Sequence, residues 1–316
     1  MYRIGVDLGG TNIAVGVVDD NFNIVGRGKM KTNAPREAKA IFDDVAAAVR
    51  MAVADADLTL DDIASIGIGT PGSVDKAKGV IEFANNLDFN HVPAKELLSA
   101  NLGMDKIYID NDANCAALGE AVAGVGKGVK NFIAITLGTG VGSGIVVDGK
   151  LVTGVNYAAG EMGHMVICMD GEQCNCGRRG CWERYASATA LIAQTKDMMK
   201  KNVDSIMWDL VDDNIARVSG RTAFDAMRKG DAAAKAVVDN YIRYIAVGLV
   251  NVINALQPDV VCIGGGISHE KETLLAPLRK HVGRGRYSIY AAKQTELCCA
   301  VLGNDAGIIG AAMLDN

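Results

Sequence analysis

The stretch between Gly163 and Tyr185 concentrates side chains that bind metal ions. Cys174, Cys176 and Cys181 offer three sulfur ligands within eight residues, and His164 lies ten residues upstream. Three cysteines and one histidine complete the tetrahedral shell of Zn²⁺ and leave no position for a catalytic water. The spacing therefore predicts a structural zinc ion held by these four side chains.

Free or redox-active thiols are the alternative interpretation of this cluster. The C-x-C spacing differs from the C-x-x-C spacing of thioredoxin-like sites and argues against a redox role. Cys168 is a further sulfur in the same segment and leaves the choice of ligands open. The remaining cysteines lie in apolar stretches and are expected to be buried free thiols: Cys115, Cys262, Cys298 and Cys299.

Carboxylates flank the predicted metal loop on both sides. A short glycine-rich loop has little apolar surface with which to order itself, so metal binding supplies its folding energy. Glu161 and Glu183 stand at the two ends of this loop, where they would offer directional acceptors to a polyol. His164 can bind the metal through one ring nitrogen and turn the other toward a ligand. Solvated loop carboxylates are the alternative for both glutamates.

Two glycine-rich turns have the composition of phosphate-binding loops. Glycine removes the side chain that would keep an anion from the backbone N–H groups, and it permits positive φ. A tight β-turn explains either segment alone, whereas two related copies favour phosphate binding. Asp7, at the end of an apolar strand, is suited to hold Mg²⁺ or its waters. The predicted nucleotide-binding residues are Asp7, Gly9, Gly10, Thr11, Asn12, Gly138, Thr139 and Gly140.

Two common nucleotide motifs do not account for these turns. The sequence has no G-x-x-x-x-G-K-[ST] motif, so it does not predict a P-loop protein. The first turn is followed by the apolar residues 13–18, which continue as a strand. A dinucleotide fingerprint requires a helix at that point.

The elements around the turns indicate an α/β protein with an internal repeat. Residues 2–18 predict two strands joined by the first glycine turn, and residues 131–147 repeat that layout, with Ile4 matching Ile133 and Gly9 matching Gly138. Residues 35–56 and 238–256 have helical spacing, and residues 63–68 and 260–263 read as buried strands. We therefore expect two similar α/β lobes that face a shared cleft.

Composition limits the classes of partner. The 316 residues carry a net charge of −5 and contain no long basic run, so nucleic acid is not an expected partner. Residues 1–3 lead directly into a strand pattern rather than a signal peptide. The longest apolar stretch, residues 241–256, is interrupted by polar side chains and is too short to span a bilayer. These features predict a cytoplasmic protein without a membrane partner.

Five motifs together resemble the ROK family, which contains repressors and sugar kinases. They are DLGGTN, GTPGSVD from Gly69, NDAN from Asn111, LGTGVGSG from Leu137, and E-x-G-H with C-x-C-G-x-x-G-C-x-E between Glu161 and Glu183. The resemblance runs from end to end and is greatest to the bacterial glucokinases of the family. It implies the two-lobed actin, Hsp70 and hexokinase-like (ribonuclease H-like) fold. The expected lobes are residues 1–112 with 303–316, and residues 113–302 with a zinc loop at 161–183.

The resemblance also implies roles for individual residues. Asp112 matches the catalytic base, although a helix N-cap is the alternative for this aspartate. The residues that match sugar contacts are Gly72, Asn86, Asn111, Asp112, Glu161, His164 and Glu183. The zinc set is matched by His164, Cys174, Cys176 and Cys181, and the adenosine-side turn by residues 264–266, including Gly265 and Gly266. Asn12 departs from the family, in which many members carry lysine at this position.

The implied reaction is transfer of the γ-phosphoryl group of ATP, with Mg²⁺, to the 6-hydroxyl of glucose. Another hexose kinase, acting on N-acetylmannosamine, allose or fructose, is the first alternative. A sugar-sensing regulator is less favoured, because only four residues precede Gly5 and leave no room for a helix-turn-helix segment. An inactive sugar-binding protein is disfavoured by Asp7 and Asp112. Assembly into a homodimer or homotetramer is also expected from the family.

Overall fold

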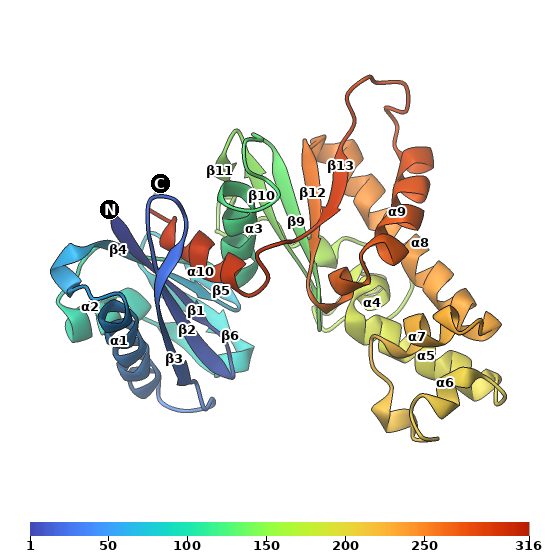
Figure 1. Ribbon diagram of the computed structural model, residues 1–316, viewed down its shortest axis with the longest axis horizontal. Helices are drawn as coiled ribbons and strands as arrows, with labels where there is room; N and C mark the ends of the chain where they lie inside the picture. Colours follow the sequence, from blue (N-terminus) through green and yellow to red (C-terminus); the bar gives the residue numbers. More distant parts are fainter. Residues whose placement is uncertain (316) are drawn as a thin grey trace. The chain divides into compact units, whose positions relative to one another are not determined.

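The computed structural model describes residues 1–315, and these form two compact α/β units (Figure 1). The first unit contains Met1–Ala134, Gly144–Gly160 and the residues from Ala300 onward. The second contains Ile135–Ser143 and Glu161–Cys299. The α/β class predicted from the sequence is confirmed.

The first sheet has the strand order β3-β2-β1-β4-β8. Its strands are β1 (Tyr2–Leu8), β2 (Asn12–Val18), β3 (Ile24–Lys31), β4 (Ile63–Thr70) and β8 (Ile107–Asn111). The first three form an antiparallel meander, whereas β4 and β8 join in parallel through helical crossovers. The glycine turn at residues 9–11 connects β1 to β2, as the alternating pattern predicts. A small antiparallel sheet follows, built from β5 (Ser73–Asp75), β6 (Val80–Ala84) and β7 (Phe89–Val92).

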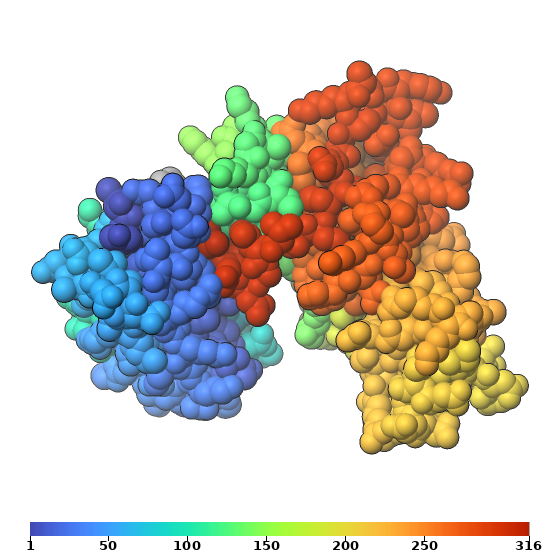
Figure 2. Space-filling model, viewed as in Figure 1, coloured from blue at the N-terminus to red at the C-terminus, as the bar shows by residue number. Residues whose placement is uncertain are grey.

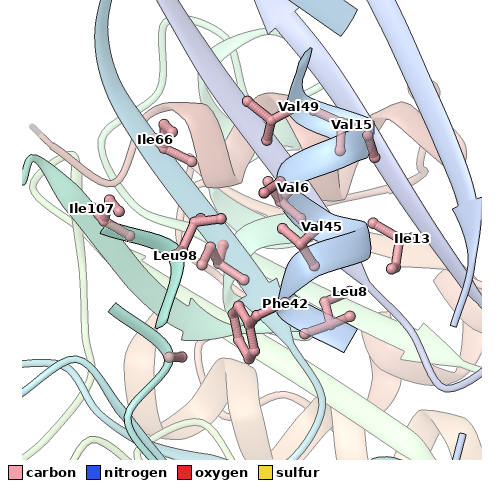
Figure 3. Packing of buried hydrophobic residues seen from close by; sticks show 14 of the residues in the cluster. Val6, Leu8, Ile13, Val15, Phe42, Val45, Val49, Ile66, Leu98 and Ile107 are labelled. Carbon is pink, nitrogen blue, oxygen red and sulfur yellow. The ribbon is translucent and has the colours of Figure 1, made fainter. Parts of the chain in front are cut away.

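Helix α1 (Ala38–Asp55) covers one part of this sheet and forms the main core with it. Its buried side chains, Phe42, Val45 and Val49 among them, recur at helical spacing and lie against the apolar residues of β1 and β2 (Figure 3). Helix α2 (Ala94–Leu102) adds Leu98 to the same cluster. Each of these side chains is fully removed from water, so the burial stabilises the sheet and fixes the end of β1 where Asp7 lies.

The C-terminal helix α10 (Asp305–Ala312) packs directly on the first sheet, together with α3 (Asp112–Val122). Two glycines on adjacent strands make this approach possible. A Cβ atom at Gly5 would lie 1.8 Å from the Ile308 carbonyl oxygen, and one at Gly67 would lie 1.7 Å from that of Ala311. In the space-filling view, red atoms of the C-terminal segment lie directly against the blue N-terminal residues (Figure 2).

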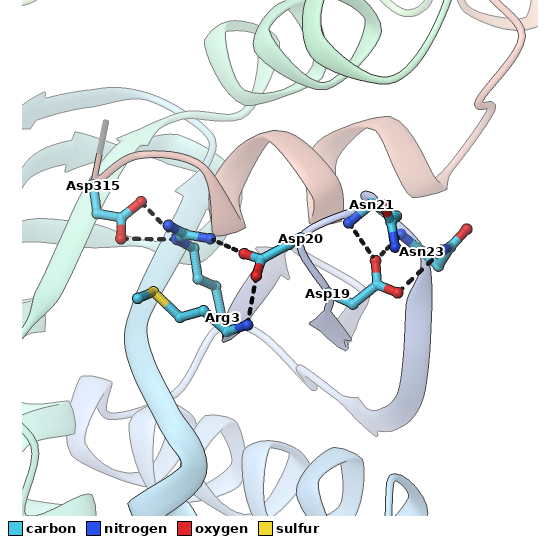
Figure 4. A network of polar contacts seen from close by, with 7 residues as sticks. Arg3, Asp19, Asp20, Asn21, Asn23 and Asp315 are labelled. Carbon is cyan, nitrogen blue, oxygen red and sulfur yellow. Dashed lines mark hydrogen bonds and ion pairs between the residues drawn. The ribbon is translucent and has the colours of Figure 1, made fainter.

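Polar contacts tie the two ends of the chain together in the first unit. The Nε of Arg3 donates to the Asp315 carboxylate at 2.9 Å, while its Nη1 lies 3.3 Å from Asp20 (Figure 4). The amino terminus also contacts Asp20, at 2.6 Å. The Ser65 hydroxyl on β4 donates to the same Asp315 oxygen as Arg3, also at 2.9 Å.

The second sheet repeats the order of the first, β11-β10-β9-β12-β13. Its strands are β9 (Phe132–Leu137), β10 (Val141–Val147), β11 (Lys150–Leu151), β12 (Val260–Gly264) and β13 (Glu296–Cys299). In both sheets a glycine turn joins the first strand of the set to the second, and the last two strands of the order pair in parallel. The internal repeat expected from residues 2–18 and 131–147 is therefore confirmed as a repeat of topology.

Helices make up most of the second unit. They are α4 (Glu183–Ala186), α5 (Ala188–Lys201), α6 (Ile206–Asp209), α7 (Thr222–Arg228), α8 (Ala232–Leu256) and α9 (Glu272–Gly285). Within residues 1–315, α8 is the one helix long and apolar enough to cross a membrane. It packs instead against α5, α7 and α9, and Tyr241, Ile245 and Leu249 on it are buried. It is the core helix of this unit.

The compact units divide the chain differently from the predicted lobes. Residues 113–134 and 144–160 were assigned to the second lobe, but they group with the first unit. The physical reason lies in α3, which packs against α10 and β4. A Cβ atom at Gly310 of α10 would lie 1.7 Å from the Cys115 carbonyl oxygen, so the two helices are in close contact. The lobe boundaries as functional domains stay a prediction.

Candidate functional site

The first glycine turn presents backbone donors that have no partner among residues 1–315. Gly9 N–H donates to the Asn12 carbonyl at 3.0 Å and closes the turn. Among residues 1–315, the N–H groups of Gly10 and Thr11 form no hydrogen bond. Neighbouring free N–H groups in a turn are a binding feature for anions. The turn therefore has the donors that a phosphate group requires.

The end of β3 supports this turn and brings a cation to it. Thr32 is buried; its hydroxyl donates to the Gly9 carbonyl at 2.6 Å and its N–H donates to that of Thr11 at 3.1 Å. The β2–β3 register sets Lys31 opposite Asn12, and the Lys31 ammonium donates to the Asn12 side-chain oxygen at 2.9 Å. Asn12 thus carries no charge itself, but its side chain accepts a hydrogen bond from a lysine of the next strand.

Two carboxylates lie close to this turn. Burial, and then the charge of Asp112, raises the pKa of Asp7 from 3.8 to about 6. Desolvation by the surrounding protein also raises the pKa of Asp112, although part of its side chain stays open to solvent. An accessible carboxylate with a raised pKa is suited to accept a proton from a substrate. Two carboxylates that repel each other also fit a divalent cation, which would relieve the repulsion.

A buried ion pair anchors the segment that carries Asp112. Asp110 is fully buried at the end of β8, and one of its oxygens lies 2.6 Å from the Lys76 ammonium. The other oxygen accepts from the Asn111 N–H at 2.7 Å and from the Asn114 side chain at 2.8 Å. These bonds fix the β8–α3 junction, so the position of Asp112 is determined by its neighbours on both sides.

Asn111, and not Asp112, caps helix α3. The Asn111 side-chain oxygen accepts from the N–H groups of Ala113 and Asn114, at 2.9 and 3.4 Å. The N-cap alternative for Asp112 is therefore wrong, because the residue before it takes that position. Asp112 is the first helical residue, and its carboxylate accepts from the Ala113 N–H at 2.8 Å. The cap frees Asp112 for another role.

The other predicted sugar contacts of the first unit lie beside these groups. Asn111 Nδ2 donates to the Gly72 carbonyl at 3.0 Å, so the two matched positions are in direct contact. Gly72 has φ +89°, and a Cβ atom there would lie 2.0 Å from the Phe83 carbonyl oxygen. Asn86 is exposed next to the first turn, where a Cβ atom at Gly10 would lie 2.9 Å from its carbonyl oxygen.

The second glycine turn resembles the first, with one difference. Gly138 N–H donates to the Gly140 carbonyl at 3.0 Å, while the N–H groups of Thr139 and Gly140 form no hydrogen bond among the described residues. The next donor, Val141 N–H, is taken by the Glu183 carboxylate at 3.0 Å. Glu183 was predicted from its place beside the metal loop, and the structure connects it to the turn.

The turn after β12 lies beside the second glycine turn. Gly265 has φ +81°, and a Cβ atom there would lie 2.5 Å from the Leu137 carbonyl oxygen. Only glycine allows the backbone to come so close with this φ. Gly265 and Gly266, matched to the adenosine side, therefore lie directly beside the end of β9 and the second glycine turn.

The four predicted metal ligands converge in the second unit. Their donor atoms all lie within 4.8 Å of one another: His164, Cys174, Cys176 and Cys181. The His164 Nδ1 is 3.6 Å from the Cys174 sulfur, and the Cys176 and Cys181 sulfurs are also 3.6 Å apart. Zinc bonds of about 2.0–2.3 Å in a tetrahedron give ligand separations of roughly 3.3–3.8 Å. The geometry fits one zinc ion, and Cys168 lies outside the set.

The protonation of the thiols depends on their surroundings. Burial, followed by the neighbouring thiols, raises the pKa of Cys181 to about 12. A backbone hydrogen bond from Arg178 lowers the pKa of Cys176. Because a thiol must lose its proton to bind a metal, Cys181 would bind it with proton release at neutral pH.

The remaining cysteines largely follow their prediction. Cys115 and Cys262 are buried, whereas Cys298 and Cys299 are half-buried, and all four are free thiols. Burial raises the pKa of Cys115 well above its ordinary range, so this thiol is neutral.

Glu161 lies exposed at the start of the loop, and its carbonyl accepts from the His164 N–H at 3.1 Å.

Comparison with known proteins decides the family. A family model described as the ROK family matches residues 3–316. The chain belongs to the ROK family. Among its ROK relatives, the "Glucokinase" of Streptomyces coelicolor is 38% identical over 98% of this chain and 96% of its own length. The "Glucokinase" of Halalkalibacterium halodurans is 37% identical over 99% and 94% of the two chains.

A solved ROK structure gives the same result at the level of the fold. A glucokinase from Streptomyces griseus, described as a complex with glucose and AMPPNP, superposes with a TM-score of 0.82. It is 36% identical and covers 99% of both chains. The two-lobed fold class implied by the motifs is confirmed.

Three residues of this ROK protein were missed by the sequence analysis. Asp110 stands two positions before Asp112, but nothing in the sequence pairs it with Lys76, which is 34 residues away. Lys31 becomes visible only through the register of β2 and β3. The one available signal for Lys31 was the number of residues in the β2–β3 hairpin, which sets the residue that pairs with Asn12.

Proposed function

We propose that the protein is a glucokinase that transfers the γ-phosphoryl group of ATP to the 6-hydroxyl of glucose. The observation that carries this proposal is Asp112, an accessible carboxylate of raised pKa next to a turn with free N–H donors. The names of the relatives in Streptomyces and Halalkalibacterium support the choice of glucose. The bound AMPPNP of the Streptomyces griseus structure supports ATP.

Asp112 acts as the general base in this mechanism. Its carboxylate takes the proton of the 6-hydroxyl as the oxygen attacks the γ-phosphorus, and ADP leaves in line. The Asp110–Lys76 pair and the Asn111 cap hold the carboxylate in place. Positioning of this kind supplies a large part of the rate in phosphoryl transfer.

Each glycine turn, within its own unit, offers donors for phosphate groups of the nucleotide. The free N–H groups of Gly10 and Thr11 in the first unit, and of Thr139 and Gly140 in the second, donate to phosphate oxygens. Lys31 adds a positive charge at the first turn, next to Asn12. Asp7 would hold the Mg²⁺ that accompanies ATP. When bound, this ion would neutralise part of the negative charge of the phosphates. Gly265 and Gly266 lie on the adenosine side.

Polar residues of each unit contribute contacts to the hexose. The first unit offers Asn86, Asn111 and the Gly72 backbone, and the second offers Glu161, His164 and Glu183. His164 points its Nδ1 toward Cys174, which leaves Nε2 for a sugar hydroxyl. Glu183 connects the hexose contacts to the second glycine turn through the Val141 N–H.

The cysteine loop holds a structural zinc ion in this proposal. His164, Cys174, Cys176 and Cys181 supply all four ligands at distances that suit a tetrahedron. The ion orders the segment from Glu161 to Glu183 and takes no part in the chemistry. A cytoplasmic location, assembly with further copies of the chain and the predicted lobe boundaries belong to the same proposal.

An ATP-coupled assay over a panel of hexoses tests the function. We expect glucose to be phosphorylated with the highest kcat/KM, ahead of mannose, fructose, allose and N-acetylmannosamine. A higher value for another hexose would replace glucose by that sugar and leave the kinase assignment in place. No phosphorylation of any sugar would refute the enzyme proposal, and DNA binding at physiological salt would then favour a regulator.

A further inference from the structure

A cavity in the second unit is lined by residues to which no role has been assigned so far. Its volume is about 240 Å³, and it is lined by the metal loop, α4, α5 and α8. The lining residues that matter here are Glu172, Arg184, Tyr185, Gln194, Asn240 and Tyr244. None of the residues proposed for glucose, ATP or zinc lines it. Glu183 precedes Arg184 but bonds to the second glycine turn instead.

Arg184 lines this cavity without a partner. Its Nε is buried and has no hydrogen-bond acceptor. Among residues 1–315, no hydrogen bond or ion pair of its side chain occurs. A guanidinium carries five donors and keeps its charge at any physiological pH. A buried cationic donor without an acceptor is costly, so an acceptor from outside the chain would stabilise it.

Gln194 on α5 offers the complementary group. Its Nε2 donates to the Tyr185 carbonyl at 2.9 Å, which fixes the orientation of the amide. The Oε1 is buried and accepts no hydrogen bond. The cavity therefore contains one unpartnered donor and one unpartnered acceptor. A ligand that satisfies both must combine an acceptor, best an anionic one, with a hydrogen-bond donor such as a hydroxyl.

The remaining walls decide between a charged and a neutral ligand. Asp197 at the rim is paired with Lys200 at 3.1 Å, and Glu172 is exposed. Arg184 is therefore the one charged side chain that is both half-buried and without a partner in the lining. The rings of Tyr185 and Tyr244, with centroids 4.8 Å apart, supply an apolar wall. This combination favours an anion with a carbon skeleton over a free inorganic ion.

We propose that this cavity binds a hydroxylated anion of monosaccharide size, with its phosphate or carboxylate group on Arg184 and a hydroxyl on Gln194. The guanidinium fork matches both of these anionic groups in a bidentate manner. The volume is below the roughly 300–1,000 Å³ that drug-sized ligands occupy, which limits the ligand to a single sugar ring or an open chain of similar size. The site goes beyond the proposed kinase reaction.

Calorimetric titration of the whole chain tests the proposal. The probes are glucose 6-phosphate, gluconate and inorganic phosphate, each added with glucose at saturation so that the proposed hexose site is filled. We expect glucose 6-phosphate or gluconate to bind. Arg184→Met should weaken that binding at least about tenfold, since a charged hydrogen bond is lost. Arg243→Met removes an exposed arginine of α8 outside the lining and should change nothing.

A second variant guards against a folding defect in Arg184→Met. Gln194→Glu puts a negative charge into the same cavity, which repels an anionic ligand and competes with it for Arg184, so it should also weaken binding about tenfold or more. Equal affinity of the original protein and both variants would overturn the site. Inorganic phosphate that binds as tightly as glucose 6-phosphate would overturn the role of the hydroxyl. A change from oligomer to monomer in Arg184→Met would assign the cavity to an interface between copies.

Discussion

At the scale of single residues, the surroundings of Asp112 decide what its carboxylate does. Asn111 takes the cap of α3, and Asp110 is neutralised by Lys76 within the protein. Of the two carboxylates in this segment, Asp112 is the accessible one. Its raised pKa comes from desolvation, which favours the protonated form and makes the group a better proton acceptor than a solvated aspartate.

Asp112→Asn should lower kcat by about two to four orders of magnitude, the usual contribution of a general base. Glucose binding should stay within a few fold, because the amide keeps the shape of the side chain. Steady-state kinetics and calorimetry with glucose measure the two effects separately. An unchanged kcat would remove Asp112 from the role of base.

Asp7 leads to a pH-dependent prediction about stability. Its pKa is about 6 in the folded protein and 3.8 as the ordinary value. A raised pKa means that the folded state binds the proton more tightly, so its stabilising effect is present at low pH and is lost as pH rises through about 6. In magnesium-free buffer, Asp7→Asn should therefore raise the free energy of unfolding at pH 8 by about 1–3 kcal/mol.

The gain of Asp7→Asn should shrink as the pH falls through 6 and disappear near pH 4. Urea unfolding at several pH values measures it. Asp19 serves as the control: desolvation acts to raise its pKa, but hydrogen bonds with Asn23 and Asn21 and the positive amino terminus lower the pKa overall. A pH-independent difference between Asp7→Asn and the original protein would contradict the raised pKa.

Lys31→Ala should raise the KM for ATP about three- to tenfold, since an exposed cation contributes of the order of 1 kcal/mol. The KM for glucose at saturating ATP should not change, and Lys31→Arg should restore most of the loss. Lys29, exposed two residues earlier on β3, provides the matched control as Lys29→Ala. Equal KM values for ATP in the two alanine variants would exclude Lys31 from phosphate binding.

At the scale of elements, the metal loop is a short segment whose order depends on side chains more than on apolar packing. Cys174 and Cys181 are buried, and backbone bonds such as Cys174 N–H to the Arg178 carbonyl at 2.8 Å close the knuckle. Trp182 joins the loop to α8 by donating to the Tyr244 carbonyl at 2.9 Å. Order in the loop therefore reaches Glu183, the next residue.

Cys176→Ser should lower the zinc content well below one ion per chain and lower the melting temperature at the same time, since metal-binding energy is folding energy. Metal analysis and thermal unfolding measure the two quantities. Cys168→Ser, in the same loop but outside the ligand set, should keep both unchanged. A Cys176→Ser protein that is stable, active and free of metal would refute the structural zinc.

At the scale of the whole molecule, the chain repeats one sheet topology and returns to its beginning. Both sheets have the same strand order, so each places a glycine turn after its first long strand. The C-terminal helix α10 then packs on the first sheet, and Arg3 bonds to Asp315. The first unit therefore requires both ends of the chain.

Gly67→Ala tests this return of the chain. The added methyl would meet the Ala311 carbonyl at 1.7 Å, and α10 would have to move away from the sheet. We expect a loss of about 1–3 kcal/mol or more in the free energy of unfolding. Gly283→Ala in α9, where a Cβ atom meets nothing within 4 Å, should be neutral or stabilising. Equal stability of the two variants would contradict the close packing of α10.

The sequence by itself determined the fold class, the repeat, the glycine turns and the members of the cysteine–histidine cluster of this protein. These features depend on local spacing: alternation in strands, glycine in turns, and three cysteines within a segment of eight residues. The tertiary structure alone decided the Asp110–Lys76 pair, the contact of Lys31 with Asn12, the bond of Glu183 to the second turn and the free Arg184. Those contacts join residues that are distant in the chain, and strand register and helix packing bring them together without any local signal.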